Sequence, residues 1–503
     1  MKRIAFLAFL TFTISSFFVS CASSKMTNSL YLSYLDSGDY EPCISYLEEK
    51  NKSEKNSDRV RDEFDLAMMR HFQKDYDSSL EILNKTDRLM DDMVTKSVTK
   101  GALALLFNEN AAEYAGNPYE YVYINIFNAL NYYNKGDFDE AAVEIRRMNE
   151  KQRKFLSDYG EWISDENFSD DGKISSAYSV LKLDDETVKN SFPEKPTEDD
   201  IFRDSATARY LSIVFAMMDD SVNNSWNIEA DTAIFKALNP SFDIESESSL
   251  SDGMGRLDII AFSGLIGRRG ERRVRIGPFP GLQFESEKRF VFIPPFDIEF
   301  VYPEFPAPQK SLEPVPMGTI GWGPSFTIYP GKNEIIKMPE NGVSKIQLLF
   351  DNGRKEEFSL LEDFNYAVAH DVRMKARHAY SRSVKRSLAK KLSSVVAASA
   401  GMAVAEQNVR ENENFLGIAA YAVAYLTAAK LIDQVDKTET ADIRQVYALP
   451  ARSYAAGLEL EPGKYSFKVQ YFSENGSLIK EETFSDIEVK KGKTVLVESS
   501  CQK

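Results

Sequence analysis

A short pattern that occurs three times constrains the fold of the N-terminal part of the chain more than any other feature. In each copy, an acidic and an aromatic residue are followed by a small residue three positions after the aromatic and by an apolar residue one turn later. The copies are Asp39-Tyr40 with Cys43 and Leu47, Asp75-Tyr76 with Ser79 and Leu83, and Asp137-Phe138 with Ala141 and Ile145. Because a small residue at this place lets two helices approach closely, the pattern predicts helical hairpins over residues 21–156.

This spacing resembles the turn and second helix of tetratricopeptide repeats. In the third copy, Tyr123, Phe127 and Leu130 form an apolar stripe on the helix before the turn, as expected for a packed hairpin. Cys43 occupies the small-residue position of the first copy. We therefore expect a packed thiol there rather than a disulfide with Cys501, although an exported protein would permit that bond.

The rest of the chain predicts an α+β fold. Acidic residues, glycine and proline punctuate residues 157–200, which we interpret as a linker. Helical patterns return within 201–250, and Asn239-Pro240 is predicted to stop the last of them. Residues 251–360 form a β-rich section in which Asn352-Gly353 predicts a hairpin turn. Its clearest strand-like runs are Leu257–Phe262, Arg289–Ile293, Ile298–Tyr302 and Ser325–Tyr329. Alternating apolar residues over 441–503 indicate a C-terminal antiparallel β module.

Between the two β sections, residues 361–440 predict a helical pair. The first helix is expected over roughly 361–407 with a break near Gly401, and the second over about 414–435. Residues 395–435 are rich in Ala, Gly and Val, which allow close helix packing. The uncharged run from Phe415 to Ala429 is too short for a membrane span, so we favour a buried helical pair over insertion into the membrane. A membrane contact or an oligomer interface at these helices stays open.

The first helix of this pair is basic and amphipathic. From Arg373 to Lys391 it carries eight Lys or Arg residues and no acid. Such a helix binds either anionic lipid or an acidic protein surface, and we favour pairing with a partner or with the acidic helical half of this chain. The candidate interaction surface consists of Arg373, Arg377, Arg382, Lys385, Arg386 and Lys390.

The N-terminus predicts export. Two basic residues precede an uncharged apolar run of about 15 residues, which is shorter than the roughly 20 residues of a membrane span and fits a signal peptide over residues 1–20. The run ends at Ser20-Cys21, which resembles the lipobox of bacterial lipoproteins; an ordinary signal peptide is the alternative. The resemblance implies that Cys21 carries a diacylglyceryl group and an N-acyl chain such as palmitate. Ala22, where an aspartate often retains lipoproteins at the inner membrane, favours the outer membrane.

Several short sequence segments follow one another in a characteristic order from about residue 30 to the end. They are Asn131-Tyr132-Tyr133, Gly136-Asp137, Val143 to Arg147, Tyr302-Pro303, the basic helix around Arg377 to Lys391, Ala441 to Arg444, Leu449-Pro450 and Pro462-Gly463. In this order the chain resembles a family of uncharacterised tetratricopeptide-like bacterial lipoproteins. Members are often neighbours of the lipoproteins that activate outer-membrane-tethered cell-wall synthesis. The resemblance implies a place in the cell envelope and no defined activity.

Composition and motifs favour a non-catalytic function. The formal net charge of −16 argues against nucleic-acid binding, which requires neutralised phosphates. None of the three histidines has a cysteine or carboxylate at zinc-ligand spacing. Ser387 and Lys390 have the spacing of a nucleophile and its base, but they lie in a basic helix without a companion motif. We therefore predict no catalytic residue, metal or cofactor.

Together these features predict a lipid-anchored scaffold of the outer membrane. Its body would lie in the periplasm, and its helical-repeat groove would bind another envelope protein. Two other classes stay open: an envelope enzyme that uses paired carboxylates on cell-wall glycan, and an oligomeric or pore-forming component built on residues 395–435. The sequence specifies neither the partner nor the oligomeric state.

Overall fold

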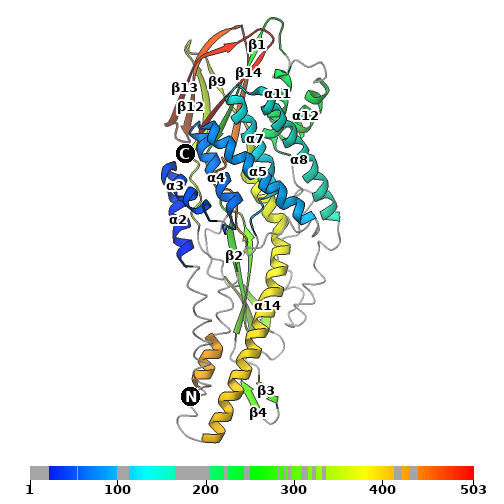
Figure 1. Ribbon diagram of the computed structural model, residues 1–503, viewed down its shortest axis with the longest axis vertical. Helices are drawn as coiled ribbons and strands as arrows, with labels where there is room; N and C mark the ends of the chain where they lie inside the picture. Colours follow the sequence, from blue (N-terminus) through cyan, green and yellow to red (C-terminus); the bar gives the residue numbers. More distant parts are fainter. Residues whose placement is uncertain are drawn as a thin grey trace.

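The described residues form a head of helices and two β-sheets, from which a long arm extends (Figure 1). In this computed structural model they are residues 22–53, 55–98, 113–164, 204–219, 225–242, 250–279, 283–286, 289–292, 296–306, 315–319, 325–330, 336–412, 422–430 and 440–503. The predicted signal peptide, Cys21 and most of the predicted acidic linker lie outside them. The chain combines helices with several sheets, which confirms the α+β class.

Eight helices are described in the head. They are α2 (Ala22–Ser37), α3 (Tyr40–Asn51), α4 (Arg59–Phe72), α5 (Tyr76–Val98), α7 (Pro118–Asn134), α8 (Phe138–Ser164), α11 (Ala206–Met218) and α12 (Ser225–Leu238). Helix α8 continues through residues 157–164, which the sequence had assigned to the linker. Helix α12 ends directly before Asn239-Pro240, the predicted stop signal.

Three helix pairs, α2–α3, α4–α5 and α7–α8, are joined by the same turn. Gly38, Lys74 and Gly136 adopt left-handed φ values of 75°, 65° and 84°. In each turn the next N–H bonds to a carbonyl five residues earlier, which closes the helix end as a Schellman motif. These bonds are Asp39 to Tyr34 (3.1 Å), Asp75 to Arg70 (2.9 Å) and Asp137 to Tyr132 (2.9 Å). Helical hairpins therefore form where they were predicted, while the likeness to tetratricopeptide repeats stays a prediction.

The three small residues of the pattern, Cys43, Ser79 and Ala141, are all buried where the two helices of a hairpin meet. The Cys43 thiol donates to the carbonyl of Tyr31 at 3.5 Å. Ser79 Oγ donates to the equivalent carbonyl, that of Ala67, at 2.9 Å. Cys43 and Cys501 are both buried, unpaired thiols, so the packed thiol predicted at position 43 is confirmed.

The head also contains a β-sandwich of two four-stranded sheets. Sheet I has the strand order β10-β11-β1-β14, and sheet II has the order β13-β12-β8-β9. The strands are β1 (Gly255–Ser263), β8 (Val343–Phe350), β9 (Lys355–Glu357), β10 (Ser359–Asp363), β11 (Arg452–Leu460), β12 (Gly463–Ser473), β13 (Leu478–Val489) and β14 (Thr494–Cys501). The hairpin predicted at Asn352-Gly353 joins β8 to β9, with Gly353 at φ 85°.

Both sheets combine strands from the two predicted β sections. Strand β1 pairs antiparallel with β11 and parallel with β14, and β8 pairs antiparallel with β12. Residues 441–503 therefore supply half of each sheet and do not form the separate antiparallel module that we expected. The alternating pattern identified the strands correctly, but it contains no information on which strands become neighbours.

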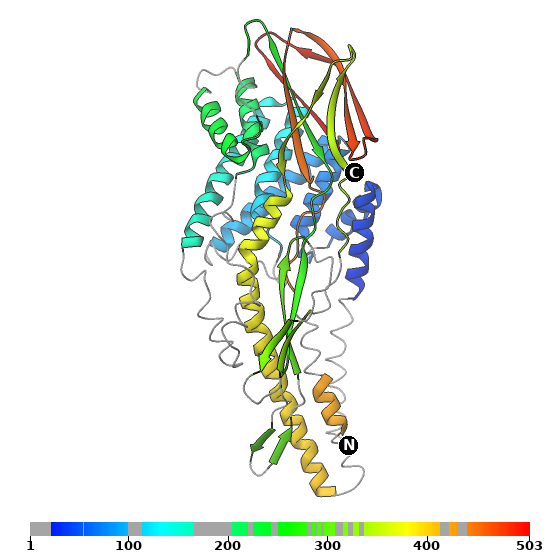
Figure 2. The same cartoon turned by 180° about the vertical axis from the view of Figure 1, so that it is seen from behind.

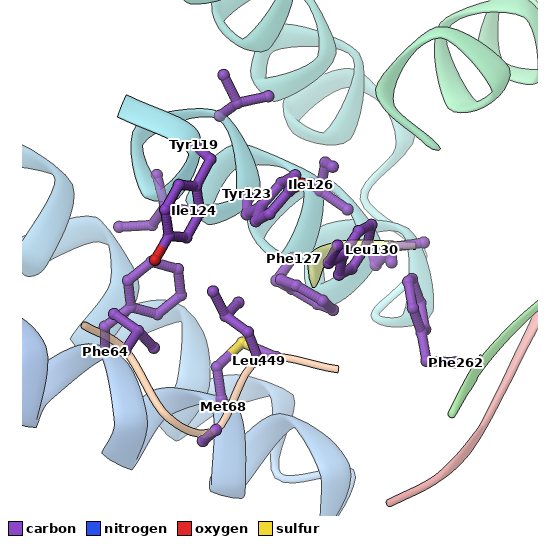
Figure 3. Close-up of a cluster of buried hydrophobic side chains, with 14 of the residues drawn as sticks. Phe64, Met68, Tyr119, Tyr123, Ile124, Ile126, Phe127, Leu130, Phe262 and Leu449 are labelled. Atoms are coloured by element: carbon purple, nitrogen blue, oxygen red, sulfur yellow. The ribbon is translucent and has the colours of Figure 1, made fainter. Parts of the chain in front are cut away.

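The helices pack on the outer face of sheet I. Strand β1 alternates, so Ile260 and Phe262 face the helices while Ile259 and Ala261 face sheet II. Figure 3 shows Phe127 and Leu130 of α7 close to Phe262 in this core, and the ring centroids of Phe127 and Phe262 lie 5.3 Å apart. The head helices and the outer face of sheet I therefore share one hydrophobic core, and a second core lies between the two sheets.

The arm consists of one long helix beside a second group of strands, as both views show (Figures 1 and 2). Helix α14 (Asn365–Asn412) has 48 residues and packs against β5. The arm sheet has the order β5-β2-β7-β6, and β3 and β4 form a hairpin. Their bounds are β2 (Gly270–Phe279), β3 (Gln283–Ser286), β4 (Arg289–Phe292), β5 (Phe296–Glu304), β6 (Val315–Thr319) and β7 (Ser325–Pro330). Residues 422–430 form a short helix beside the far part of α14.

The helical pair differs from its prediction in two respects. Helix α14 begins at Asn365 because residues 359–363 pair with β11 as strand β10. It also continues through Gly401, where a break was expected. A single glycine costs a helix only about 1 kcal/mol, which the flanking helical residues offset. Of the predicted second helix, only residues 422–430 lie among the described residues.

Candidate functional site

An irregular segment of the chain, residues 440–451 (the 440–451 segment), packs against helices α4 and α7 of the helical hairpins. Figure 3 shows Leu449 of this segment between Met68 of α4 and the side chains of α7. Val446, Ala448 and Leu449 are fully buried. These faces of α4 and α7 are therefore covered by the protein's own chain.

Two carboxyl side chains on the helices bind the backbone of the 440–451 segment. Their hydrogen bonds satisfy N–H groups that a neighbouring strand would satisfy in a β-sheet. Asp65 Oδ1 accepts hydrogen bonds from the backbone N–H groups of Tyr447 and Ala448, both at 2.7 Å. Glu120 Oε1 accepts from the N–H of Val446 at 2.8 Å. Buried backbone donors require acceptors, and the carboxyl oxygens of Asp65 and Glu120 supply them here. These contacts fix an irregular chain inside the head.

Glu120 serves α7 at the same time. Asn117 and Glu120 form a capping box at the start of α7, with Pro118 at the first helical position. Glu120 Oε2 accepts from the Asn117 N–H at 2.8 Å and from the Tyr114 hydroxyl at 2.6 Å. The Asn-Pro-x-Glu spacing is a readable signal for a helix start that the sequence analysis did not use. Nothing in the sequence, however, relates Glu120 to Val446.

The Asp65 carboxyl is buried, and its pKa is raised above the ordinary value. Burial raises the pKa of Asp65 to about 7, although hydrogen bonds from Ala448 and Tyr447, the charge of Arg61 and the Tyr31 hydroxyl all oppose this rise. The Tyr31 hydroxyl donates to Asp65 Oδ2 at 2.9 Å. The side chain is fully buried, so its pKa affects the stability of the head.

The start of α14 is fixed to the head by a buried charge cluster. Arg269 donates to Asp371 Oδ2 at 2.7 Å and to Asn117 Oδ1 at 3.1 Å. Lys375 lies 2.9 Å from Asp371 Oδ1 and donates to the same Asn117 oxygen at 3.1 Å. Burial alone would raise the pKa of Asp371, but Lys375 and Arg269 lower it. Two cations thus share one carboxylate where the arm meets α7.

Most residues of the predicted basic surface on α14 interact with other residues of the protein. Arg373 is exposed, whereas Arg382, Arg386 and Lys390 are half-buried, and all four take part in interactions within the molecule. The side chains of Arg377 and Lys385 lie outside the described part. The helix face that meets β5 contains Tyr380, whose ring lies 5.8 Å from that of Phe300. The helix does not present the four described residues as one free cationic surface.

A second basic cluster lies on and before β2, and neighbouring carboxylates neutralise it; it consists of Arg268, Arg269, Arg272, Arg273 and Arg275. Arg268 binds Asp36 of α2. Arg273 and Arg275 reach the two oxygens of Glu299 on β5, at 2.6 and 3.1 Å. Their charges therefore join elements of this chain to one another.

The arrangement holds elements together, and we find no set of groups poised for chemistry in the described residues. Within these ranges, His, Cys, Asp and Glu side chains nowhere gather in a group of three that would bind a metal ion. In the same ranges, no helix has the length and apolar character that a bilayer span requires. The chain matches no protein-family model, no curated protein and no solved structure.

Proposed function

We propose that this protein is a lipid-anchored, non-catalytic scaffold of the bacterial outer membrane, with its body in the periplasm. The lipobox-like ending at Cys21 supports the anchor. Helix α2 begins at Ala22, so a lipid on Cys21 would lie directly before the first helix of the head. The three equivalent helix turns support membership of the tetratricopeptide-like lipoprotein family.

The observation that carries the scaffold proposal is the arm. A continuous helix of 48 residues is about 72 Å long at 1.5 Å per residue. Its beginning is fixed to the head through Asp371, and both views show the remainder leaving the head together with the arm strands (Figures 1 and 2). Such an arm would present a binding surface far from the membrane-anchored head.

The partner surface that we propose lies on the 422–430 helix of the arm. Its Ala428 is buried, whereas Val423 and Leu426 are 63% and 61% exposed. These two side chains are three residues apart and share one face of the helix. We place the partner surface here and not on the helical hairpins because the 440–451 segment covers α4 and α7.

Photo-crosslinking in cells that produce the full-length, lipidated chain tests this surface. A crosslinker at Leu426 is expected to yield a discrete adduct with one envelope protein, and Val423→Asp should abolish that adduct. Leu478 provides the matched control, because it is 51% exposed but lies on the edge strand β13 of the head. No adduct from position 426, or the same adduct from position 478, would contradict the proposed surface.

The anchor is tested separately. Alkaline carbonate extraction of the Cys21→Ala variant should release the whole chain into the soluble fraction. Retention of that variant in the membrane would show that the lipid is not what holds the protein there.

A further inference from the structure

The best-defined polar network that the proposed function does not use surrounds His71. This side chain is fully buried near the end of α4, where the helices meet sheet I. Its Nδ1 lies 2.7 Å from Asn131 Oδ1 on α7, and its Nε2 lies 2.6 Å from Glu498 Oε1 on β14. The ring packs edge-on against Phe127 with centroids 5.1 Å apart. One imidazole thus connects two helices with a strand of the sandwich.

The surrounding hydrogen bonds determine which way each contact of His71 runs. Ser79 Oγ donates to the Ala67 carbonyl at 2.9 Å, so it accepts from Asn131 Nδ2, also at 2.9 Å. Asn131 therefore turns its oxygen toward His71. On the other side, Glu498 accepts from Asn134 Nδ2 at 2.7 Å through its second oxygen. Both ring nitrogens face acceptors, and an imidazole can donate from both nitrogens only when it is protonated.

We propose that His71 is held as an imidazolium and acts as a pH-sensitive clasp between the helix layer and strand β14. In the protonated state it donates to Asn131 and Glu498 together. Loss of either ring proton leaves a lone pair facing an acceptor oxygen inside the protein, which is costly in a buried site. The contact between α4, α7 and β14 therefore weakens as the pH rises.

The charged groups around the clasp are consistent with this assignment. From the sandwich, Glu498 of β14 and Glu482 of β13 face the site. From the helices, Lys74 in the α4–α5 turn binds Glu482 at 2.5 Å. Tyr76 of α5 contributes a hydroxyl whose pKa is raised by burial and by both glutamates, so it stays neutral. Helix α7 contributes the uncharged Asn131, Asn134 and Phe127. A charged His71 balances Glu498 as Lys74 balances Glu482.

The direction of the pH effect follows from the same contacts. Burial alone would lower the pKa of His71, but the charge of Glu498 and the hydrogen bonds to Glu498 and Asn131 raise it above its ordinary value. A folded-state pKa above the unfolded value of about 6.5 gives a contribution to stability that is complete below pH 6.5. That contribution is lost as the pH rises through the folded-state value.

Nitrogen-15 NMR of the full-length protein labelled only at histidine tests the protonation state. The chain has three histidines, and a His71→Gln variant identifies the signal of interest. We expect two protonated ring nitrogens at pH 7 and a titration above pH 6.5. A neutral ring at pH 7, with Asn131 turned to donate its amide proton, would overturn the proposal.

Urea unfolding between pH 6 and pH 9 provides a second readout. Glu498→Gln keeps an oxygen that accepts from a neutral imidazole but removes the charge that stabilises the imidazolium. Over this range we expect the unfolding equilibrium constant of the unmodified protein to rise more than that of Glu498→Gln, because only the unmodified protein loses a proton that the Glu498 charge stabilises. Glu488→Gln on β13 is the control, because it removes an equal charge from a carboxylate that is 55% exposed. Equal pH dependence in Glu498→Gln and the control would overturn the clasp.

Discussion

Asp65 shows how a single side chain replaces secondary structure in the head. It accepts from two backbone N–H groups of the 440–451 segment and from the Tyr31 hydroxyl. Asp65→Ala leaves all three donors without an acceptor and should destabilise the protein by about 3 kcal/mol. Asp65→Asn keeps the oxygen that accepts from the backbone and should cost about 1 kcal/mol or less. Urea unfolding at pH 5 distinguishes the two variants, and equal losses would contradict this role of Oδ1.

The raised pKa of Asp65 also predicts a pH dependence. Because its folded-state pKa is about 7, above an unfolded value of 3.8, the contribution to stability is complete below pH 3.8 and is lost as the pH rises through 7. Asp65→Asn has no such proton to lose. The stability difference should therefore shift in favour of the variant between pH 5 and pH 8. A constant difference across this range would mean that the carboxyl titrates normally.

The three equivalent turns provide a test of backbone strain alone. Gly136 has φ 84°, and an added Cβ would meet nothing within 4 Å. Gly136→Ala should therefore cost about 1–2 kcal/mol, the price of a left-handed conformation for an L-residue. Gly463→Ala is the control, since its nearest contact would be an ordinary 3.7 Å and its φ is not left-handed. Thermal unfolding should separate the two variants; similar losses would point to another cause.

At the scale of single residues, the sequence predicted the repeated small and turn residues but not the long-range partners of buried side chains. The small residues and turn residues recur at a fixed local spacing, so a local pattern reveals them. Asp65 and Glu120 bind backbone groups 382 and 326 residues further along the chain. No local pattern contains that information.

At the scale of elements, the start of α14 depends on charge balance. Asp371 binds two cations, the buried Arg269 and the largely buried Lys375. Asp371→Asn removes the one carboxylate that both cations bind directly and should destabilise the protein by about 3–5 kcal/mol. Glu340→Gln, which removes a carboxylate that is 84% exposed in its pair with Lys337, should leave stability unchanged. Chemical denaturation measures both, and a small loss in Asp371→Asn would contradict the role of this cluster.

The ends of helices and strands could be predicted where a short local sequence determines them, and less well elsewhere. Asn352-Gly353 and Asn239-Pro240 were placed correctly because their backbone preferences are strong. The beginning of α14 depends on the pairing of residues 359–363 with β11, which no local signal specifies. The basic residues of α14 were identified from the sequence, but the sequence did not show that they interact with other residues of the protein.

At the scale of the whole molecule, the sandwich makes the two β sections interdependent. Strands β11 and β14 lie on either side of β1, so without β1 they have no partner between them. A fragment of residues 441–503 should therefore remain unfolded. An amide NMR spectrum with narrow proton dispersion would agree with this expectation. A well-dispersed spectrum would mean that the fragment folds as the independent module that its alternating pattern suggested.

The central claim is that a lipid at one cysteine determines where this head and arm operate. Intact-protein and N-terminal peptide mass spectrometry of the native protein, purified from its membrane, tests it most directly. The account predicts a chain that begins at Cys21 and carries a diacylglyceryl thioether and an N-terminal acyl group. A free thiol at Cys21, or a mature chain that begins at another residue, would contradict it.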